Sequence, residues 1–516
     1  MTRDSLALDL AAALAAACLI LGTAATLLEP NRIYVSALGY SMNDQVNHIG
    51  IARTLADTGH LGSPLVYPAA LGRAATKTYV YMPGYHVLAA TFYRLLGYSD
   101  LVALLPSACA YAASGLLLIL IGRQMSNPAT GRVAAFLFLA FPANVLYALS
   151  AMTDMCLVAA TVLAFYGYVR LPLRLRVLAA PLLLMAPVLV RETGALLVVP
   201  MALLILLGDP SALAVRLRRS VALLALSMLT VISVLHSDFA SGRPSLQRQA
   251  MFTDDWSAFT SDAVAYRAVK ADWSQVPAIF AARAPLTVMF LLHGQNLAAS
   301  AMRVMLAGIP LGILAFARRR EPLGLAVAAY VTITAGVHVF HFFFGATGMR
   351  MLLPTFPFTA LLAAGMLVSG FGWLRRRGSA RAPAVLAALG VAAWLAVGWW
   401  EIRRTFAWYP AAAALDDADA QFIVSLGHDD RRLLAAPYDI ALSYVHRRYP
   451  VKWSFVPENL PTLALLKGYY DVGTVVLPVP HPLAGVLPLA GFTLDGERVH
   501  RGAAYAIWRA RPEQAR

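Results

Sequence analysis

The sequence predicts a polytopic α-helical membrane protein with about 11 transmembrane helices, followed by a small extracytoplasmic α/β domain. Of its 516 residues, 59% are hydrophobic and only 13% are charged, whereas an ordinary soluble protein is about a quarter charged. Apolar runs of about 20 residues, long enough to cross a bilayer as helices, recur along most of the chain. Basic residues also gather in every second connection between these runs, as the positive-inside rule requires.

The expected spans can be placed to within a few residues. The first is longer than the 7–15-residue apolar core of a cleaved signal peptide, so we expect it to be retained. Residues 83–97 are short for a transmembrane span. Counting them as a span would also place every later arginine cluster outside the cell, so we expect an interfacial or re-entrant helix there. The spans are 6–28, 101–121, 132–149, 153–170, 177–190, 193–208, 220–236, 298–317, 323–344, 351–374 and 383–400.

The basic residues orient these spans. The arginines between spans two and three, and those after spans four, six, eight and ten, then face the cytoplasm. The N-terminus is expected in the cytoplasm and the C-terminus outside, in a multi-pass protein of the plasma (inner) membrane. These arginines are Arg123, Arg132, Arg170, Arg174, Arg176, Arg216, Arg218, Arg219, Arg318, Arg319, Arg320, Arg375, Arg376, Arg377 and Arg381.

Two regions follow from this topology. Residues 1–400 form the transmembrane domain, with a first outer loop at 29–100 and a second large outer loop at 237–297. Residues 401–516 are less apolar and alternate between strand and helix patterns, which predicts a small α/β domain. Neither a GxGxxG motif nor a P-loop occurs there, so no nucleotide site is expected. The strands are expected at 432–436, 451–456 and 473–478, and the helices near 410–427, 438–448 and 459–470.

The net charge of +15 has two explanations. A nucleic-acid-binding protein would carry a soluble basic patch with aromatic residues between the charges. Here the arginines follow the membrane topology instead, so we expect no nucleic acid as partner. The cysteines Cys18, Cys109 and Cys156 lie in apolar spans without metal-ligand spacing and form no disulfide framework.

The first outer loop holds the most informative acid, Asp44, in the stretch SMNDQVNHIGIARTLADTG from Ser41 to Gly59. Ser41 and Asp44 form a variant of the capping box, so Asp44 complements a helix start, acts as a catalytic acid, or does both. His48 lies four residues later, on the same helix face. It is a candidate metal ligand, proton partner or polar wall, and one Asp with one His does not define a metal site.

Three further charged residues are expected at the outer face. Asp154, in SAMTDM, lies at the mouth of two spans and either serves function or caps a helix together with Thr153. Arg191 and Glu192, in VLVRETGALL, form a structural ion pair, or Arg191 clamps a phosphate.

These stretches resemble the GT-C glycosyltransferases, in particular the protein O-mannosyltransferase and aminoarabinose-transferase group. The resemblance covers about residues 6–375. It differs from that group at Gln45, where a second acid is common, and at Met82, where some members carry a Lys; Lys77 or Arg73 is the candidate for the missing charge. The W-W-D-Y-G pattern of oligosaccharyltransferases is absent. The resemblance rests on Asp44, the proline-led run YVYMPGYHVLAATFYRLLG, Asp154, and the Arg-led span starts RETGALLVVP and RMLLPTFPF.

The resemblance implies transfer of a sugar from a polyprenyl-phosphate donor to a glycan, lipid or protein acceptor at the outer membrane face. A phosphate leaving group needs Arg or Lys, and an acceptor hydroxyl needs a carboxylate to take its proton. Asp44 is the candidate general base, and single displacement would invert the anomeric centre. The candidate catalytic residues are Asp44 and Asp154, and the candidate substrate-binding residues are His48, Lys77, Tyr81, His86, Arg191, Glu192, His338, His341 and Arg350.

No metal site is expected from these residues, although a divalent metal stays open as a cofactor. The competing class is a secondary transporter, which many spans and intramembrane charges would also suit. Transporters usually show internal repeats with matched interrupted segments, and we find no such repeat here. A lipid-carrier glycan ligase or polymerase is a third interpretation, because it shares the donor type.

Overall fold

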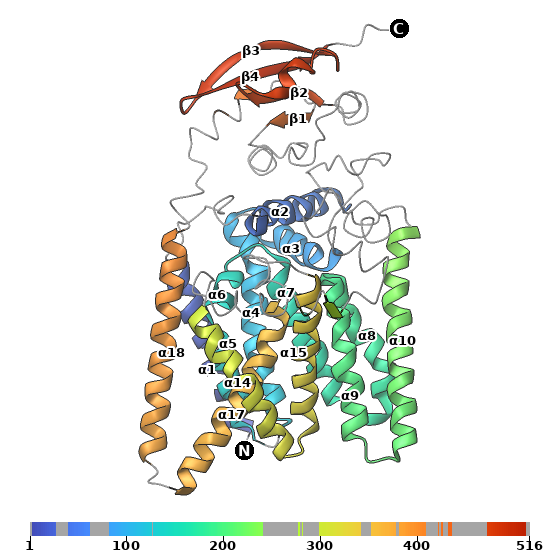
Figure 1. Ribbon diagram of the computed structural model, residues 1–516, viewed down its shortest axis with the longest axis vertical. Coiled ribbons are helices and arrows are strands. Elements are labelled where there is room, and N and C mark those ends of the chain that lie inside the picture. Colours follow the sequence, from blue (N-terminus) through green and yellow to red (C-terminus); the bar gives the residue numbers. More distant parts are fainter. Residues whose placement is uncertain are drawn as a thin grey trace.

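The computed structural model is a helical bundle with two helices across one end and a four-stranded sheet beyond that end (Figure 1). The residues it describes are 3–26, 40–61, 82–125, 127–240, 277–278, 281, 299–341, 352–377, 381–408, 422, 425–426, 432–435 and 472–511.

The bundle consists mainly of long apolar helices. Among the described residues, five helices are long and apolar enough to cross a membrane, or six if the bent pair α5 and α6 counts as one span. The expected number of about 11 is therefore not confirmed in this part of the chain. The bundle elements are α1 (Arg3–Ala25), α4 (Asp100–Gly122), α5 (Ala129–Leu139), α6 (Pro142–Ala148), α7 (Thr153–Arg170), α8 (Leu173–Val190), η3 (Glu192–Leu197), α9 (Val198–Gly208), α10 (Leu213–Ala240), α14 (Ala299–Arg318), α15 (Pro322–His341), η6 (Leu353–Thr355), α17 (Phe356–Arg377) and α18 (Arg381–Trp408).

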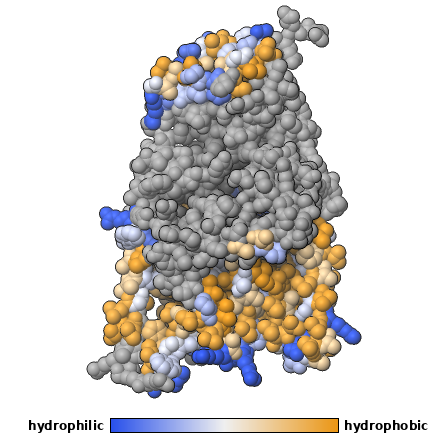
Figure 2. Space-filling view, viewed as in Figure 1, coloured by the Kyte–Doolittle hydropathy of each residue, from blue (hydrophilic) through white to orange (hydrophobic). Residues whose placement is uncertain are grey.

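Large apolar side chains cover the outside of the bundle. Leu178, Leu182, Leu229 and Leu389 are each between 61% and 72% exposed, and Figure 2 shows a continuous apolar band over the helices. Apolar patches of this extent are not left facing water in soluble proteins. They are the lipid-facing surface of an integral membrane protein.

The expected span at 132–149 is a pair of helices with a sharp bend between them. α5 ends at Leu139, α6 begins at Pro142, and the two helices are bent by 66°. Proline has no backbone N–H and is favoured at the first position of a helix, so Pro142 starts a new helix rather than continuing the old one. The side-chain amide of Asn144 donates to the carbonyl of Phe138 at 2.9 Å, which satisfies a carbonyl at the break.

Two helices from the first long loop, α2 (Tyr40–Thr58) and α3 (Pro83–Leu96), lie across one end of the bundle (Figure 1). We call this the α2–α3 end. Arg94 donates to the carbonyls of Ala56 and Leu55 at 3.0 and 3.1 Å, so it satisfies acceptors at the end of α2. Segment 83–97 thus forms a short helix outside the bundle spans, as its length predicts.

Glycine at position 84 lets α3 pack closely against α8. A Cβ at Gly84 would lie 2.8 Å from the carbonyl oxygen of Leu189. We therefore expect Gly84→Ala to lower the free energy of unfolding by about 1–3 kcal/mol through overpacking. Thermal unfolding of the purified protein measures this. The matched control is Gly22→Ala, because a Cβ at Gly22 meets no atom within 4 Å. Equal melting temperatures for the two variants would contradict the expectation.

The C-terminal region holds a four-stranded sheet of order β1-β2-β4-β3, in which β1 and β2 are parallel and the other pairs antiparallel. Its apolar core includes Val475, Leu477, Leu487 and Phe492. The strands are β1 (Arg432–Ala435), β2 (Val472–Pro478), β3 (Phe492–His500) and β4 (Ala503–Ala510).

The strands expected at 432–436 and 473–478 are confirmed as β1 and β2. The hairpin of β3 and β4 was not expected from the sequence. The two strands are joined by the two-residue loop Arg501–Gly502. Both loop residues have positive φ (51° and 79°), as a type I′ hairpin turn requires, and Gly502 was the sequence signal for such a turn. The expected strand at 451–456 and the helices at 438–448 and 459–470 lie outside the described residues, as does nearly all of the helix at 410–427.

Candidate active site

A buried ion pair lies where α7 begins and α8 ends. Nη1 of Arg191 is 3.0 Å from Oδ1 of Asp154, and Nη2 of the same guanidinium donates to Oγ1 of Thr153 at 3.1 Å. Asp154 lies in the first turn of α7, where the helix dipole favours an anion. The N-cap residue of α7 is Met152, so neither Thr153 nor Asp154 occupies the N-cap position.

This pairing gives Arg191 a partner that the sequence did not suggest. The sequence suggested the neighbouring Glu192, and that pair stays a prediction, while the structure joins Arg191 to Asp154. The Arg191 side chain keeps 14% of its surface exposed and Asp154 only 1%. The guanidinium is therefore the member of the pair that an anionic ligand can approach.

Gln45 connects α2 to this site. Its Oε1 accepts a hydrogen bond from the backbone N–H of Ala151 at 2.9 Å, and both residues are buried. Ala151 lies in the turn before Thr153 and Asp154, so the first turns of α2, which include Asp44, are fixed to the start of α7. The sequence showed Gln45 only as a difference from the GT-C pattern. No local signal reports a contact between residues 106 positions apart.

We expect Gln45→Met to destabilise the protein by about 1–3 kcal/mol, because the buried N–H of Ala151 loses its acceptor. The methionine side chain has a similar length but lacks the amide oxygen that accepts this hydrogen bond. The matched control is Gln124→Met at an exposed position, and the measurement is thermal unfolding of both variants. Similar melting temperatures would show that the Gln45 hydrogen bond contributes little to stability.

Two buried histidines form the second polar cluster. Nδ1 of His48, on α2, is 3.0 Å from Nε2 of His86, on α3, and Nδ1 of His86 is 3.0 Å from the carbonyl oxygen of Met82. The Tyr85 ring lies 5.4 and 5.6 Å from the two imidazoles, centroid to centroid. Burial lowers the pKa of His86 to about 4, and the hydrogen bond to Met82 opposes this shift only partly.

The two clusters are electrostatic neighbours. Burial raises the pKa of the Tyr85 hydroxyl, and Cys156, Tyr93 and the charge of Asp154 raise it further. Tyr85, which contacts both histidines, is therefore within electrostatic range of the ion pair. Buried ionic groups are costly unless they are paired and hydrogen-bonded. Their concentration at the end of an apolar bundle marks this region as a functional-site candidate.

The structure describes the remaining candidate residues only in part. Asp44 lies on α2 and Glu192 begins η3, while His338 and His341 lie near the end of α15. The side chains of Asp44, His338 and His341 fall outside the described part of the chain. Lys77, Tyr81 and Arg350 lie entirely outside the described residues. Within the residues that are described, no group of three or more His, Cys, Asp or Glu side chains could hold a metal ion.

The comparisons with known proteins identify the fold of the chain. No protein-family model and no curated protein matches the sequence. Among solved structures, the chain is similar to ArnT from Cupriavidus metallidurans bound to undecaprenyl phosphate. The TM-score is 0.59 at 13% identity, covering 99% of this chain and 100% of that one.

A second similar structure is the archaeal oligosaccharyltransferase AglB from Archaeoglobus fulgidus, in complex with an inhibitory peptide and a dolichol-phosphate. Here the TM-score is 0.57 at 14% identity, covering 96% of this chain and 74% of that one. The chain therefore shares the fold of these two proteins, which agrees with the fold that the resemblance implies.

Proposed function

We propose that this protein is a glycosyltransferase that moves a sugar from a polyprenyl-phosphate donor to a glycan, lipid or protein acceptor. The observation that carries the proposal is the Arg191–Asp154 pair, which joins the start of α7 to the end of α8 close to α2 and α3. A lipid head group reaches the α2–α3 end of the bundle while its polyprenyl chain stays in the bilayer. The two GT-C neighbours support the donor class, since one was solved with dolichol-phosphate and the other with undecaprenyl phosphate.

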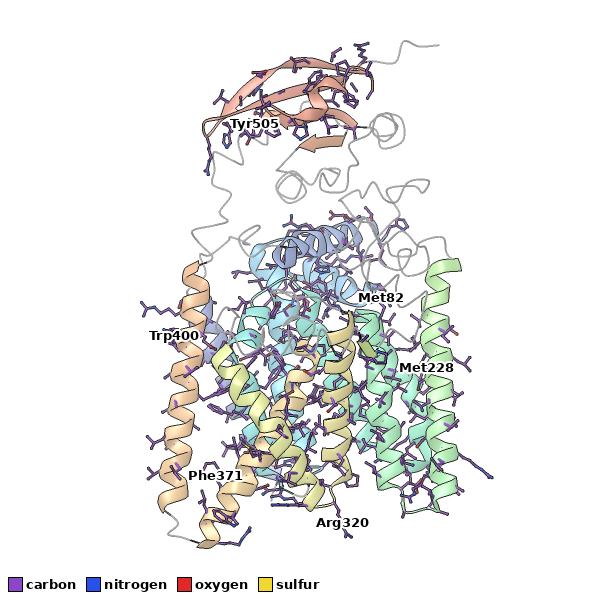
Figure 3. The ribbon with its side chains drawn as sticks, in the orientation of Figure 1. Met82, Met228, Arg320, Phe371, Trp400 and Tyr505 are labelled. Carbon is purple, nitrogen blue, oxygen red and sulfur yellow. The ribbon has the colours of Figure 1, made fainter. Side chains whose placement is uncertain are left out.

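In this proposal the α2–α3 end faces outward. Met82 lies near that end, and Arg320 lies at the opposite end of the bundle (Figure 3). Basic connections such as the one holding Arg320 favour the cytoplasm. The N-terminus is then cytoplasmic, residues 1–400 form the catalytic domain of an inner-membrane protein, and residues 401–516 form an extracytoplasmic domain that positions the acceptor or supports the site.

The proposed reaction is a single displacement. The acceptor oxygen bonds to the anomeric carbon of the sugar, and the bond from that carbon to the lipid phosphate breaks with its electron pair on the phosphate. Asp44 takes the acceptor proton. Arg191, held in place by Asp154 and Thr153, stabilises the negative charge that develops on the phosphate. Lys77 and Arg350 are further candidates for the phosphate, and the anomeric configuration inverts.

Reconstitution of the full chain in sealed lipid vesicles with a labelled polyprenyl-phosphate sugar tests the proposal. We expect release of sugar-free polyprenyl phosphate together with a single-sugar product on the acceptor. Solute uptake without any lipid donor would instead establish a transporter. Transfer of a whole glycan would establish a ligase or polymerase. Repeating the assay with a chelator shows whether a divalent metal is required.

A further inference from the structure

Two neighbouring turns, with the helix ends beside them, carry arginines at the end of the bundle opposite α2 and α3. α10 carries Arg218 in its second turn, and α14 ends at Arg318, which two more arginines follow. A Cβ at Gly208, the last residue of α9, would lie 3.6 Å from Cβ of Pro322, the first residue of α15. The turn from α9 to α10 therefore lies beside the turn from α14 to α15, and Figure 3 shows Arg320 at this end of the bundle.

Arg320 has a backbone conformation that is usual for glycine. Its φ is 52°, in the left-handed region. The N–H of Arg320 donates to the carbonyl of Ala317 at 3.0 Å, and the N–H of Glu321 donates to the carbonyl of Phe316 at 3.0 Å. These are the two hydrogen bonds of a Schellman motif at the end of α14. Glycine fits the position of Arg320 without strain, whereas a residue with a Cβ is disfavoured there. A strained position that holds an exposed arginine points to a function for its charge.

The acids in these two turns do not neutralise the exposed arginines. Asp209 is buried, pairs with Arg219 at 2.5 Å and accepts a hydrogen bond from the N–H of Ser211 at 2.8 Å. Glu321 is also buried. In the part of the chain that the structure describes, no carboxylate forms an ion pair with the four exposed arginines of this region. These four, which we call the arginine cluster, are Arg218, Arg318, Arg319 and Arg320.

An exposed apolar stripe leads to the arginine cluster on each of two helices. On α14, Leu311 and Leu314 are exposed and share a helix face with Arg318, at spacings of three and four residues. On α10, Val221 and Leu229 are exposed on the same face as Arg218. Figure 2 shows hydrophilic residues along the lower edge of the apolar band. The stripes belong to the lipid-facing surface, so the guanidinium groups lie where that surface meets the lipid headgroups.

We infer that the arginine cluster binds the headgroup of an anionic phospholipid, whose acyl chains lie along the stripes on α10 and α14. A guanidinium suits the oxygens of a phosphate. A zwitterionic headgroup adds a cation, which the cluster repels, so an anionic lipid is preferred. The stripes favour a lipid over a soluble phosphate. This lipid would lie at the opposite end of the bundle from the Arg191–Asp154 pair, so the inference does not depend on sugar transfer.

Native mass spectrometry of the full chain tests the lipid preference, with phosphatidylglycerol and phosphatidylcholine titrated separately. We expect Arg320→Gly to weaken phosphatidylglycerol binding by about fivefold, the usual contribution of one arginine near an anionic surface. Combining Arg318→Gln, Arg319→Gln and Arg320→Gly should weaken it by about 100-fold, with phosphatidylcholine binding nearly unchanged. Arg498→Gln is the matched control, because it removes an exposed arginine from β3. Unchanged phosphatidylglycerol binding by the triple variant would overturn the inference, as would inorganic phosphate binding as tightly as the lipid.

Glycine at position 320 separates lipid binding from folding. In phosphatidylcholine nanodiscs we expect Arg320→Gly to melt no lower than the unchanged protein, because glycine takes a positive φ without strain. Adding phosphatidylglycerol to the nanodiscs should raise the melting temperature of the unchanged protein, since a bound ligand stabilises the folded state. The rise should be smaller for Arg320→Gly and close to the unchanged value for Arg320→Lys, which keeps the charge. Equal rises for the unchanged protein and Arg320→Gly would overturn the role of Arg320.

Discussion

Replacing Asp44 with Asn is expected to lower the rate of sugar transfer by about 10²–10⁴-fold, the usual contribution of a positioned general base. Asparagine has the same shape but does not take a proton from the acceptor hydroxyl. α2 begins at Tyr40 and has no acid in its first turn, so Asp44 is the fifth residue of the helix and does not take the capping position that the sequence suggested. The rate is measured in membranes with a labelled polyprenyl-phosphate sugar, and the melting temperature is measured in parallel.

Asp57→Asn is the matched control, because Asp57 lies on the same helix and contacts the Tyr98 hydroxyl away from the ion pair. We expect that variant to transfer sugar at close to the unchanged rate. Should Asp44→Asn also transfer sugar at close to the unchanged rate, Asp44 has no role as a base. A fall in melting temperature with an unchanged rate would point to a structural role alone.

Replacing Arg191 with Met is expected to lower the free energy of unfolding by about 3–5 kcal/mol and to abolish transfer. Asp154, which is 1% exposed, would lose the guanidinium that pairs with its charge, and removing one partner of a buried pair is costly. Arg132→Met is the matched control. It removes an arginine from the exposed pair with Asp9, where the side chains are 45% and 18% exposed. Such surface pairs contribute about 0–1 kcal/mol.

The double variant Arg191→Met with Asp154→Asn separates stability from catalysis. We expect it to recover much of the lost stability, because the buried charge is gone, and a double-mutant cycle gives the coupling energy. Transfer should stay lost, since no guanidinium then faces the phosphate. If Arg191→Met costs no more stability than Arg132→Met, the pair contributes little to the fold. Full transfer by the double variant would remove Arg191 from the mechanism.

Local patterns were sufficient for the helical membrane class, the short α3, and the strands β1 and β2, because each depends on composition and spacing within a few turns. They did not show the 66° bend between α5 and α6 within one expected span, and they did not show the β3–β4 hairpin. The site was predicted as a set of candidates rather than as an arrangement. Asp154 and Arg191 were both candidates, and their mutual pairing was not foreseen. The role of Asp44 stays a prediction.

The amino-acid sequence by itself determined that the chain lies in a membrane, because hydrophobicity and arginine placement act through the energy of transfer into lipid, residue by residue. Only the tertiary structure decided the polar contacts of the site. Arg191 meets Asp154 across 37 positions, His86 meets His48 across 38, and Ala151 meets Gln45 across 106. Such contacts depend on how whole helices pack against one another, and the periodicity of a single helix carries no information about that packing.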